Sequence, residues 1–158
     1  ALAELQQPRV KLLVVGGTTG RIAEFGQRAE RLGIGDSVTF VPTVADVRPL
    51  LWISDAFVFP SAYETFSLVA YEAAAAGLPL LVTPVHGVID ILDDGVNGWL
   101  IGRDPLDVVQ CVRRALVDRA GFDEMGEAAA EAAQRLDQAA FGRTWRRLLS
   151  DLTAPTAR

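Results

Sequence analysis

Short apolar runs, each followed closely by glycine or proline, alternate in this chain with longer segments of helical periodicity. The runs that predict strands are 10–15, 37–41, 56–60, 80–83 and 99–101. The segments that predict helices are 18–32, 47–53, 66–76 and most of the chain after Asp104, with breaks near 120–121 and 136–137. Apolar strands separated by helices are typical of βαβ units, whose strands are buried on both faces of a parallel sheet. We therefore expect an α/β fold with a doubly wound parallel sheet and C-terminal helices.

Length and charge narrow the class of protein. The chain has 158 residues, of which 50% are hydrophobic, so it is long enough for one domain with a sizeable core. Its 20 acidic residues against 15 basic ones leave a net charge of −5. A domain that binds nucleic acid needs an excess of lysine and arginine, so we predict no nucleic-acid partner. The charge does not exclude a small phosphorylated ligand held by local groups.

The sequence also bears on location. The longest uncharged run, 73–89, is interrupted by two glycines and two prolines, which argues against a membrane span. Glu4 and the lack of a basic flank near the N-terminus argue against a signal peptide. A single cysteine, Cys111, has no partner for an internal disulfide, so we predict a reducing, cytoplasmic location. Because the chain opens without methionine and soon enters a strand, we expect it to be processed or part of a longer protein.

Ligands of a doubly wound sheet bind at the carboxyl ends of its strands. Among the segments in such positions, 60–68 stands out, because a strand end is followed there by Glu64 and a helix start. A helix N-terminus offers unpaired N–H groups and partial positive charge, which suit a diphosphate. If the helix were continuous from Glu64 to Glu72, these side chains would be about 12 Å apart and would flank one extended ligand. Taken singly, each glutamate also fits a plain surface role, and that alternative stays open.

The residues around the two glutamates resemble the signature of the group 1 retaining glycosyltransferases. The signature begins with Pro-Ser-Ala-Tyr-Glu-Thr-Phe-Ser-Leu at 60–68 and continues with Glu-Ala-Ala-Ala-Ala-Gly-Leu-Pro at 72–79. It runs on through 80–83 and 87–90 and ends in Asp-Gly-Val-Asn-Gly at 94–98. The resemblance implies that residues 1–158 form a Rossmann-like nucleotide-sugar-binding domain, one half of a GT-B architecture. It also implies that this domain lacks its first βα unit and the N-terminal acceptor-binding domain.

The same resemblance implies roles for individual residues. Glu64 would be the catalytic residue and contact the transferred sugar, and Glu72 would accept hydrogen bonds from the ribose hydroxyls. The other donor-binding residues would be Thr65, Phe66, Ser67, Leu68, Val41, Pro42 and Gly17. The family transfers a hexosyl group with retention of anomeric configuration and uses neither a cofactor nor a metal.

The chain departs from the family pattern at several positions. Pro42, Thr65 and Ser67 stand where glycine is usual, and Asp90 stands where glutamate is usual. His86, the only histidine, replaces a frequent glycine, and we expect it to pack in its loop or face the acceptor rather than act as a general base.

Other functions fit the sequence less well. A dinucleotide-binding dehydrogenase is disfavoured because 16–20 lacks the Gly-x-Gly-x-x-Gly spacing. A receiver-like signalling domain needs carboxylates at strand ends that end here in glycine and proline. A non-catalytic nucleotide or nucleotide-sugar binding module stays open, as does peripheral membrane contact through the three arginines near Trp145. The donor base, the sugar and the acceptor are not predicted.

Overall fold

The computed structural model describes residues 1–135 and 138–153. Its strands are β1 (Leu12–Val15), β2 (Val38–Val41), β3 (Phe57–Phe59), β4 (Leu80–Val82) and β5 (Gly98–Leu100). Its α-helices are α1 (Leu2–Leu5), α2 (Thr19–Arg31), α3 (Arg48–Trp52), α4 (Leu68–Ala75), α5 (Pro105–Val117), α6 (Phe122–Gln134) and α7 (Gln138–Thr153). Short 3-10 turns lie at Gly35–Ser37 and Arg119–Gly121.

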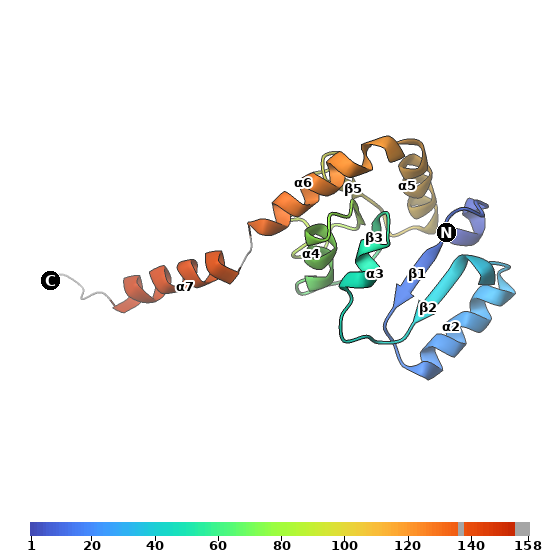
Figure 1. Cartoon of the computed structure of the whole chain (residues 1–158), viewed down its shortest axis with the longest axis horizontal. Coiled ribbons are helices and arrows are strands. Elements are labelled where there is room, and N and C mark those ends of the chain that lie inside the picture. The colour runs from blue at the N-terminus through green and yellow to red at the C-terminus, as the bar shows by residue number, and fades with distance from the viewer. Residues whose placement is uncertain (136–137, 154–158) are drawn as a thin grey trace.

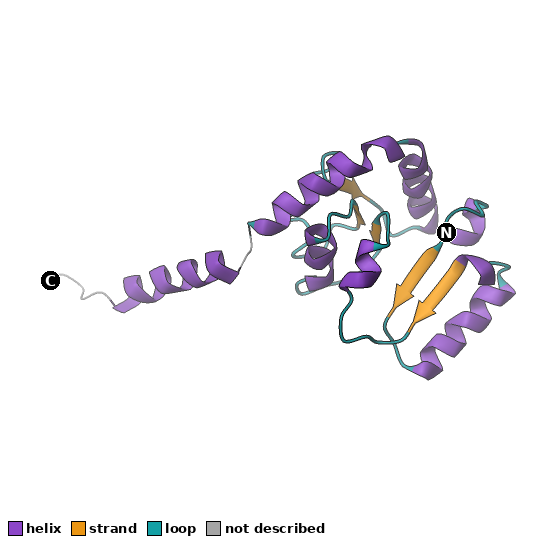
Figure 2. Cartoon of the chain, viewed as in Figure 1, coloured by secondary structure: helices purple, strands orange, loops and turns teal. Residues whose placement is uncertain are grey.

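All observed strand pairs are parallel, which confirms the predicted α/β class. The strands form two sheets, one of β1 and β2 and one in the order β3-β4-β5, rather than the one continuous sheet that we predicted. Figure 2 shows the pair β1–β2 standing apart from the three short strands, which lie among the helices. The predicted break at 136–137 lies outside the described residues.

The core surrounds the three-stranded sheet. Leu80, Leu81 and Val82 of β4 are at most 1% exposed, because helices cover both faces of that strand. Leu80 and Val82 pack with the alanines of α4 and α6, whereas Leu81 packs with Trp99 and with α5 on the opposite face. Successive side chains of a strand point to opposite faces, so one short apolar run builds both halves of this core.

Two helix starts follow the sequence directly. Thr18 accepts a hydrogen bond from the Arg21 N–H at the start of α2, and Asp104 accepts one from the Leu106 N–H at the start of α5. Both are the N-cap residue types that satisfy otherwise unpaired helix donors. The short helix α1 was not predicted.

Among the residues that the structure describes, none covers the apolar side of the last helix. In Figure 1, α7 extends away from the body of the molecule. Its large apolar side chains recur at helical spacing and are all exposed: Phe141, Trp145, Leu148, Leu149 and Leu152. Within the described ranges, none of the helices combines the length and the apolar character that a bilayer crossing requires.

We expect Cys111 to react slowly with thiol reagents in the folded protein. Cys111 is buried between β5 and α5, and burial raises the pKa of its thiol to about 11. At pH 8 the reactive thiolate is then at least about a hundredfold scarcer than for an ordinary cysteine. Ellman's reagent should therefore react with the native chain at least about a hundredfold more slowly than with the urea-unfolded chain. Equal rates for the two states would contradict this assignment.

Candidate functional site

The loop between β3 and α4 is attached to the core by Thr83. Thr83 directly follows β4 and is fully buried, and its hydroxyl donates a 2.6 Å hydrogen bond to the Ser61 carbonyl. The Ser61 hydroxyl in turn lies 3.1 Å from the Tyr63 carbonyl and 3.2 Å from a carboxylate oxygen of Glu64. The position of the half-buried Glu64 is therefore set by a short chain of hydrogen bonds that begins in the core.

The helix that follows this loop begins later than predicted. The first residue of α4 is Leu68, and Ser67 is its N-cap. Glu64 therefore lies in the loop and not on the helix, so the 12 Å separation expected for a continuous helix does not apply. The sequence predicted too early a start for this helix, because Phe66 continues the apolar pattern of the helix although it precedes the N-cap residue.

Ser67 is the most unusual polar residue of the site. Its side chain is 2% exposed, and its hydroxyl has no hydrogen-bond partner among the described residues. It does not cap the helix with its side chain, so the N–H groups of Leu68 and Val69 in the first turn are left without a side-chain acceptor. A buried hydroxyl without a partner costs free energy, which a ligand with acceptor oxygens would recover.

The loop after β4 packs directly against this helix start. Gly87 has a φ of +81°, and a Cβ there would lie 3.0 Å from the Phe66 ring and 3.2 Å from the Ser67 nitrogen. The Tyr71 hydroxyl donates a 2.8 Å hydrogen bond to the Gly87 carbonyl, and its ring stacks on Phe66 with centroids 4.9 Å apart. Burial, with a smaller contribution from the charge of Asp90, raises the pKa of Tyr71, which keeps the hydroxyl a donor. Gly87 therefore allows the close approach that places this loop beside the helix.

Glu72 lies on the second turn of α4 and is exposed. The two predicted glutamates thus differ in setting, because Glu64 is held by Ser61 whereas Glu72 projects from a helix. Thr65, Phe66 and Leu68 are exposed around the same helix start. The structure therefore brings six of the nine predicted site residues to one loop and helix.

The remaining three predicted residues lie on the two-stranded sheet. Gly16 and Gly17 follow β1 with φ of +107° and +95°, and the Gly16 N–H donates a 2.9 Å hydrogen bond to the Val41 carbonyl. Val41 ends β2, and Pro42 follows it. Gly17, Val41 and Pro42 therefore gather at the carboxyl ends of β1 and β2, where a parallel sheet offers its ligand site.

Asp94 and Asn97 of the Asp-Gly-Val-Asn-Gly turn have structural roles. A carboxylate oxygen of Asp94 accepts a 2.7 Å hydrogen bond from the Leu100 N–H. The buried Asn97 side chain accepts a hydrogen bond from the Asp93 N–H and donates one to the Ile91 carbonyl. Among the described residues, no group of three or more His, Cys, Asp or Glu side chains is arranged to hold a metal ion. His86 is exposed in the loop after β4.

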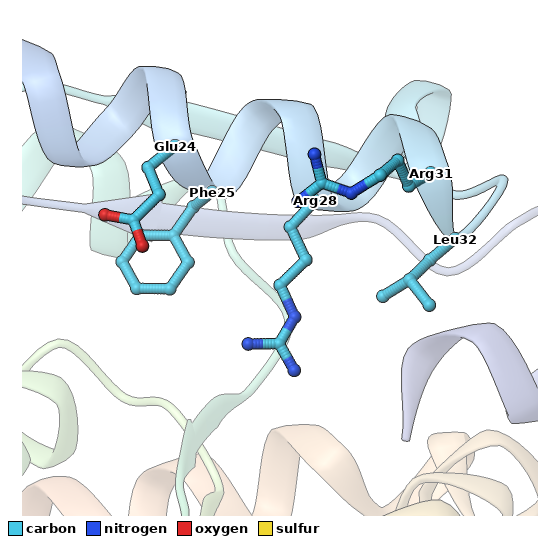
Figure 3. A pocket seen from close by; sticks show the side chains of 5 residues that line it. All are labelled: Glu24, Phe25, Arg28, Arg31 and Leu32. Carbon is cyan, nitrogen blue, oxygen red and sulfur yellow. The ribbon is translucent and has the colours of Figure 1, made fainter.

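Two hollows of the molecule lie away from the predicted site. One hollow of about 380 Å³ lies along α2 and is lined by Glu24, Phe25, Arg28, Arg31 and Leu32 (Figure 3). A second of about 380 Å³ lies between β5 and α5. At the predicted site, by contrast, large apolar side chains are exposed: Tyr63 by 75%, Leu68 by 68% and Phe66 by 45%. Such side chains around a helix N-terminus are typical of a surface that another part of a protein covers.

The chain is similar in sequence to known glycosyltransferases. A family model described as glycosyl transferases group 1 matches residues 1–118. The chain is 37% identical to D-inositol 3-phosphate glycosyltransferase 2 of Catenulispora acidiphila, with 97% of this chain and 39% of that protein covered. It is 34% identical to D-inositol 3-phosphate glycosyltransferase of Mycobacterium marinum, with 98% of this chain and 35% of that protein covered. The chain thus spans less than two fifths of the length of these two relatives.

Several solved structures share the fold of this chain. Anabaena Alr3699/HepE, solved in complex with UDP, matches with a TM-score of 0.83 and 27% identity over 94% of this chain and 43% of that one. Sucrose-phosphate synthase from Thermosynechococcus elongatus matches with a TM-score of 0.81 and 27% identity over 95% of this chain and 41% of that one. HepE has also been solved with UDP-glucose.

Proposed function

Because the chain belongs to the group 1 glycosyltransferases, we propose that it is the donor-binding part of a retaining enzyme that transfers a hexosyl group from a nucleotide sugar. The observation that carries this proposal is the start of α4, where the buried Ser67 hydroxyl has no partner among the described residues and gives the first turn no side-chain cap. A diphosphate is a ligand that such a helix start accommodates well.

The two glutamates take different parts in this proposal. Glu64, held by Ser61, contacts the transferred sugar and acts on it during transfer. Glu72, one helical turn beyond the cap residues, accepts hydrogen bonds from the ribose hydroxyls. The backbone of Thr65 to Leu68 binds the sugar and the phosphates, and Gly17, Val41 and Pro42 line the side of the base. The site needs no metal and no cofactor.

UDP and UDP-glucose are the first ligands to test. Anabaena HepE, which shares 27% of its aligned residues with this chain, has been solved in complex with UDP and, separately, with UDP-glucose. GDP, ADP and their sugars belong in the same comparison, since the site residues at Val41 and Pro42 offer backbone and apolar contacts that do not select one base.

We expect Glu72→Ala to weaken nucleotide binding about 10- to 100-fold, because a charge-assisted hydrogen bond to a hydroxyl contributes about 1.5–3 kcal/mol. Isothermal titration calorimetry of the chain with UDP and UDP-glucose measures this loss. Ser61→Ala should weaken binding less, since Ser61 touches Glu64 and not the nucleotide. Glu131→Ala, which removes an exposed glutamate of α6, is the matched control and should leave binding unchanged. Equal losses from Glu72→Ala and Ser61→Ala would reject the ribose assignment.

The proposed enzyme extends beyond this chain. An N-terminal domain that binds the acceptor would face the start of α4 and cover the exposed Tyr63, Phe66 and Leu68. It would also offer a surface for the uncovered apolar side of α7. Without that domain, water has free access to the sugar and the acceptor has no site, so the isolated chain is inactive. Sugar transfer by the isolated chain would contradict this part of the proposal.

A second candidate function uses the same site. A non-catalytic module that binds a nucleotide sugar would share the α4 site, and it differs by lacking turnover in the complete protein. We propose that the complete protein acts in the cytoplasm, where the Cys111 thiol of this chain stays reduced.

A further inference from the structure

Tyr71 lies on the first turn of α4 and contacts two segments that are far apart in the sequence. Its ring stacks on the ring of Phe66, the residue before the N-cap, with 15° between the two planes. Its hydroxyl donates the 2.8 Å hydrogen bond to the Gly87 carbonyl, in the loop after β4. Tyr71 therefore joins that loop to the start of the helix.

The Gly87 carbonyl depends on this hydroxyl. Gly87 is buried, and among the described residues Tyr71 is the only group that donates a hydrogen bond to its carbonyl. Because the pKa of Tyr71 is raised, by burial and to a smaller extent by the charge of Asp90, the hydroxyl keeps its proton at neutral pH. A buried carbonyl without a donor is unfavourable, so loss of the hydroxyl would let the loop move until water reaches Gly87.

Gly87 in turn lies against the residue that carries the proposed donor site. A Cβ at Gly87 would be 3.2 Å from the Ser67 nitrogen and 3.3 Å from the Phe66 Cα, so the loop and the helix start are in close contact. Gly87 thereby helps to exclude water from Ser67, whose buried hydroxyl has no partner among the described residues. A shift of Gly87 would admit water to this hydroxyl. A ligand would then have to displace that water, which lowers its affinity.

We propose that Tyr71 is a positioning residue of the donor site. It holds Gly87 against the helix start, and it thereby keeps the Ser67 hydroxyl without water and available to a phosphate oxygen of the nucleotide sugar. This inference rests on the proposed function, which assigns the diphosphate to the start of α4. The effect of Tyr71 is on donor affinity rather than on turnover, since Glu64 is held separately by Ser61.

Tyr71→Phe tests the proposal, because it keeps the ring that stacks on Phe66 and removes only the hydroxyl. Isothermal titration calorimetry of this chain should show UDP binding about 3- to 10-fold weaker than that of the parent, which is the loss expected for one hydrogen bond. Tyr63→Phe is the matched control, since it removes the hydroxyl of the other tyrosine, which is 75% exposed. This control should bind UDP as tightly as the parent does. Equal affinities of the parent and Tyr71→Phe would overturn the proposal.

A double-mutant cycle with Ser67→Ala distinguishes positioning from a general loss of stability. Ser67→Ala removes the hydroxyl that Tyr71 keeps available, and by itself it should also weaken UDP binding about 3- to 10-fold. If Tyr71 acts through Ser67, adding Tyr71→Phe to Ser67→Ala should weaken binding by less than about twofold further. Losses that multiply in the double variant would show that the two hydroxyls act independently, which contradicts the proposal.

Amide hydrogen exchange of the ligand-free chain tests the placement of the loop without any nucleotide. The Ser67 amide should exchange at least about fivefold faster in Tyr71→Phe than in the parent, because water reaches the helix start when the loop moves. In Tyr63→Phe it should exchange at the parental rate. An unchanged rate in Tyr71→Phe would show that the hydroxyl does not hold the loop, and the proposal would be wrong.

The outcomes separate this inference from the proposed function. If the parent chain binds UDP and the two phenylalanine variants bind it equally well, the positioning role is wrong and the donor site stands. If the parent chain binds none of UDP, GDP and ADP, the proposed function is wrong, and this inference is wrong with it whatever the exchange rates are.

Discussion

Replacing Glu64 by glutamine in the complete enzyme is expected to lower kcat about 100- to 1,000-fold, with little change in KM for the donor. Glutamine keeps the size of the side chain and its hydrogen bond with Ser61, but it removes the negative charge. Glycosyl transfer passes through a state in which positive charge develops on the sugar ring, so a nearby carboxylate stabilises that state more than the bound donor. Steady-state kinetics with saturating acceptor separates the two constants, and an unchanged kcat would remove Glu64 from the catalytic role.

Ser61→Ala is the companion variant for this measurement. It leaves the Glu64 carboxylate in place and removes the hydroxyl that positions it. We therefore expect a smaller fall in kcat than for Glu64→Gln, with nucleotide affinity close to that of the parent. A fall in affinity without a change in kcat would show that Ser61 binds the donor directly and does not position Glu64.

The largest effect on stability is expected for Gly98→Ala. Gly98 opens β5, and a Cβ there would collide with the Leu80 carbonyl and would lie 2.8 Å from the Leu80 nitrogen. Both groups belong to backbone in the centre of the core, so the collision requires β4 and β5 to separate. We expect a loss of more than about 4 kcal/mol in the free energy of unfolding, measured by urea denaturation followed by circular dichroism.

Gly26→Ala provides the matched control. Gly26 lies within α2, its φ is not positive, and a Cβ there would meet nothing within 4 Å. Alanine favours a helix over glycine by about 1 kcal/mol, so this variant should be as stable as the parent or slightly more stable. A Gly98→Ala variant that unfolds at the parental urea concentration would show that β4 and β5 move apart without cost.

Local patterns predicted the elements of this fold well. The run at 80–83 predicted a buried strand, which the structure has at Leu80–Val82, and Thr18 and Asp104 predicted two helix starts. Each of these predictions depends on neighbours within a few residues. The division into two sheets could not be predicted in this way, since strand pairing joins residues that are far apart in the chain. The four-residue helix α1 is too short to show a periodicity.

The predicted site residues of the loop and helix are close together in the sequence, whereas the residues that support them are not. Glu64, Ser67 and Glu72 were predicted from one stretch of sequence, and the structure places them on one loop and helix. The bond from Thr83 to Ser61 and the bond from Tyr71 to Gly87 join residues 22 and 16 positions apart, respectively. Hydroxyl groups on such residues are common, and only the folded arrangement distinguishes a support of the site from an ordinary surface contact. The presence of glycine at position 87 was a signal that the sequence did offer, since glycine marks positions of close backbone approach.

The unequal burial of the two sheets affects what a bound nucleotide would do to the molecule. Glu64 and the start of α4 lie against a packed core, whereas Val41 and Pro42 belong to the segment 6–50, in which Ala29 alone is buried. A ligand that contacts both the start of α4 and the ends of β1 and β2 would connect a well-packed part of the molecule with a poorly packed one. Binding would then reduce the conformational entropy of the two-stranded sheet, which lowers the net binding free energy. The measured affinity would therefore depend on how ordered this sheet is before binding as well as on the contacts with the ligand.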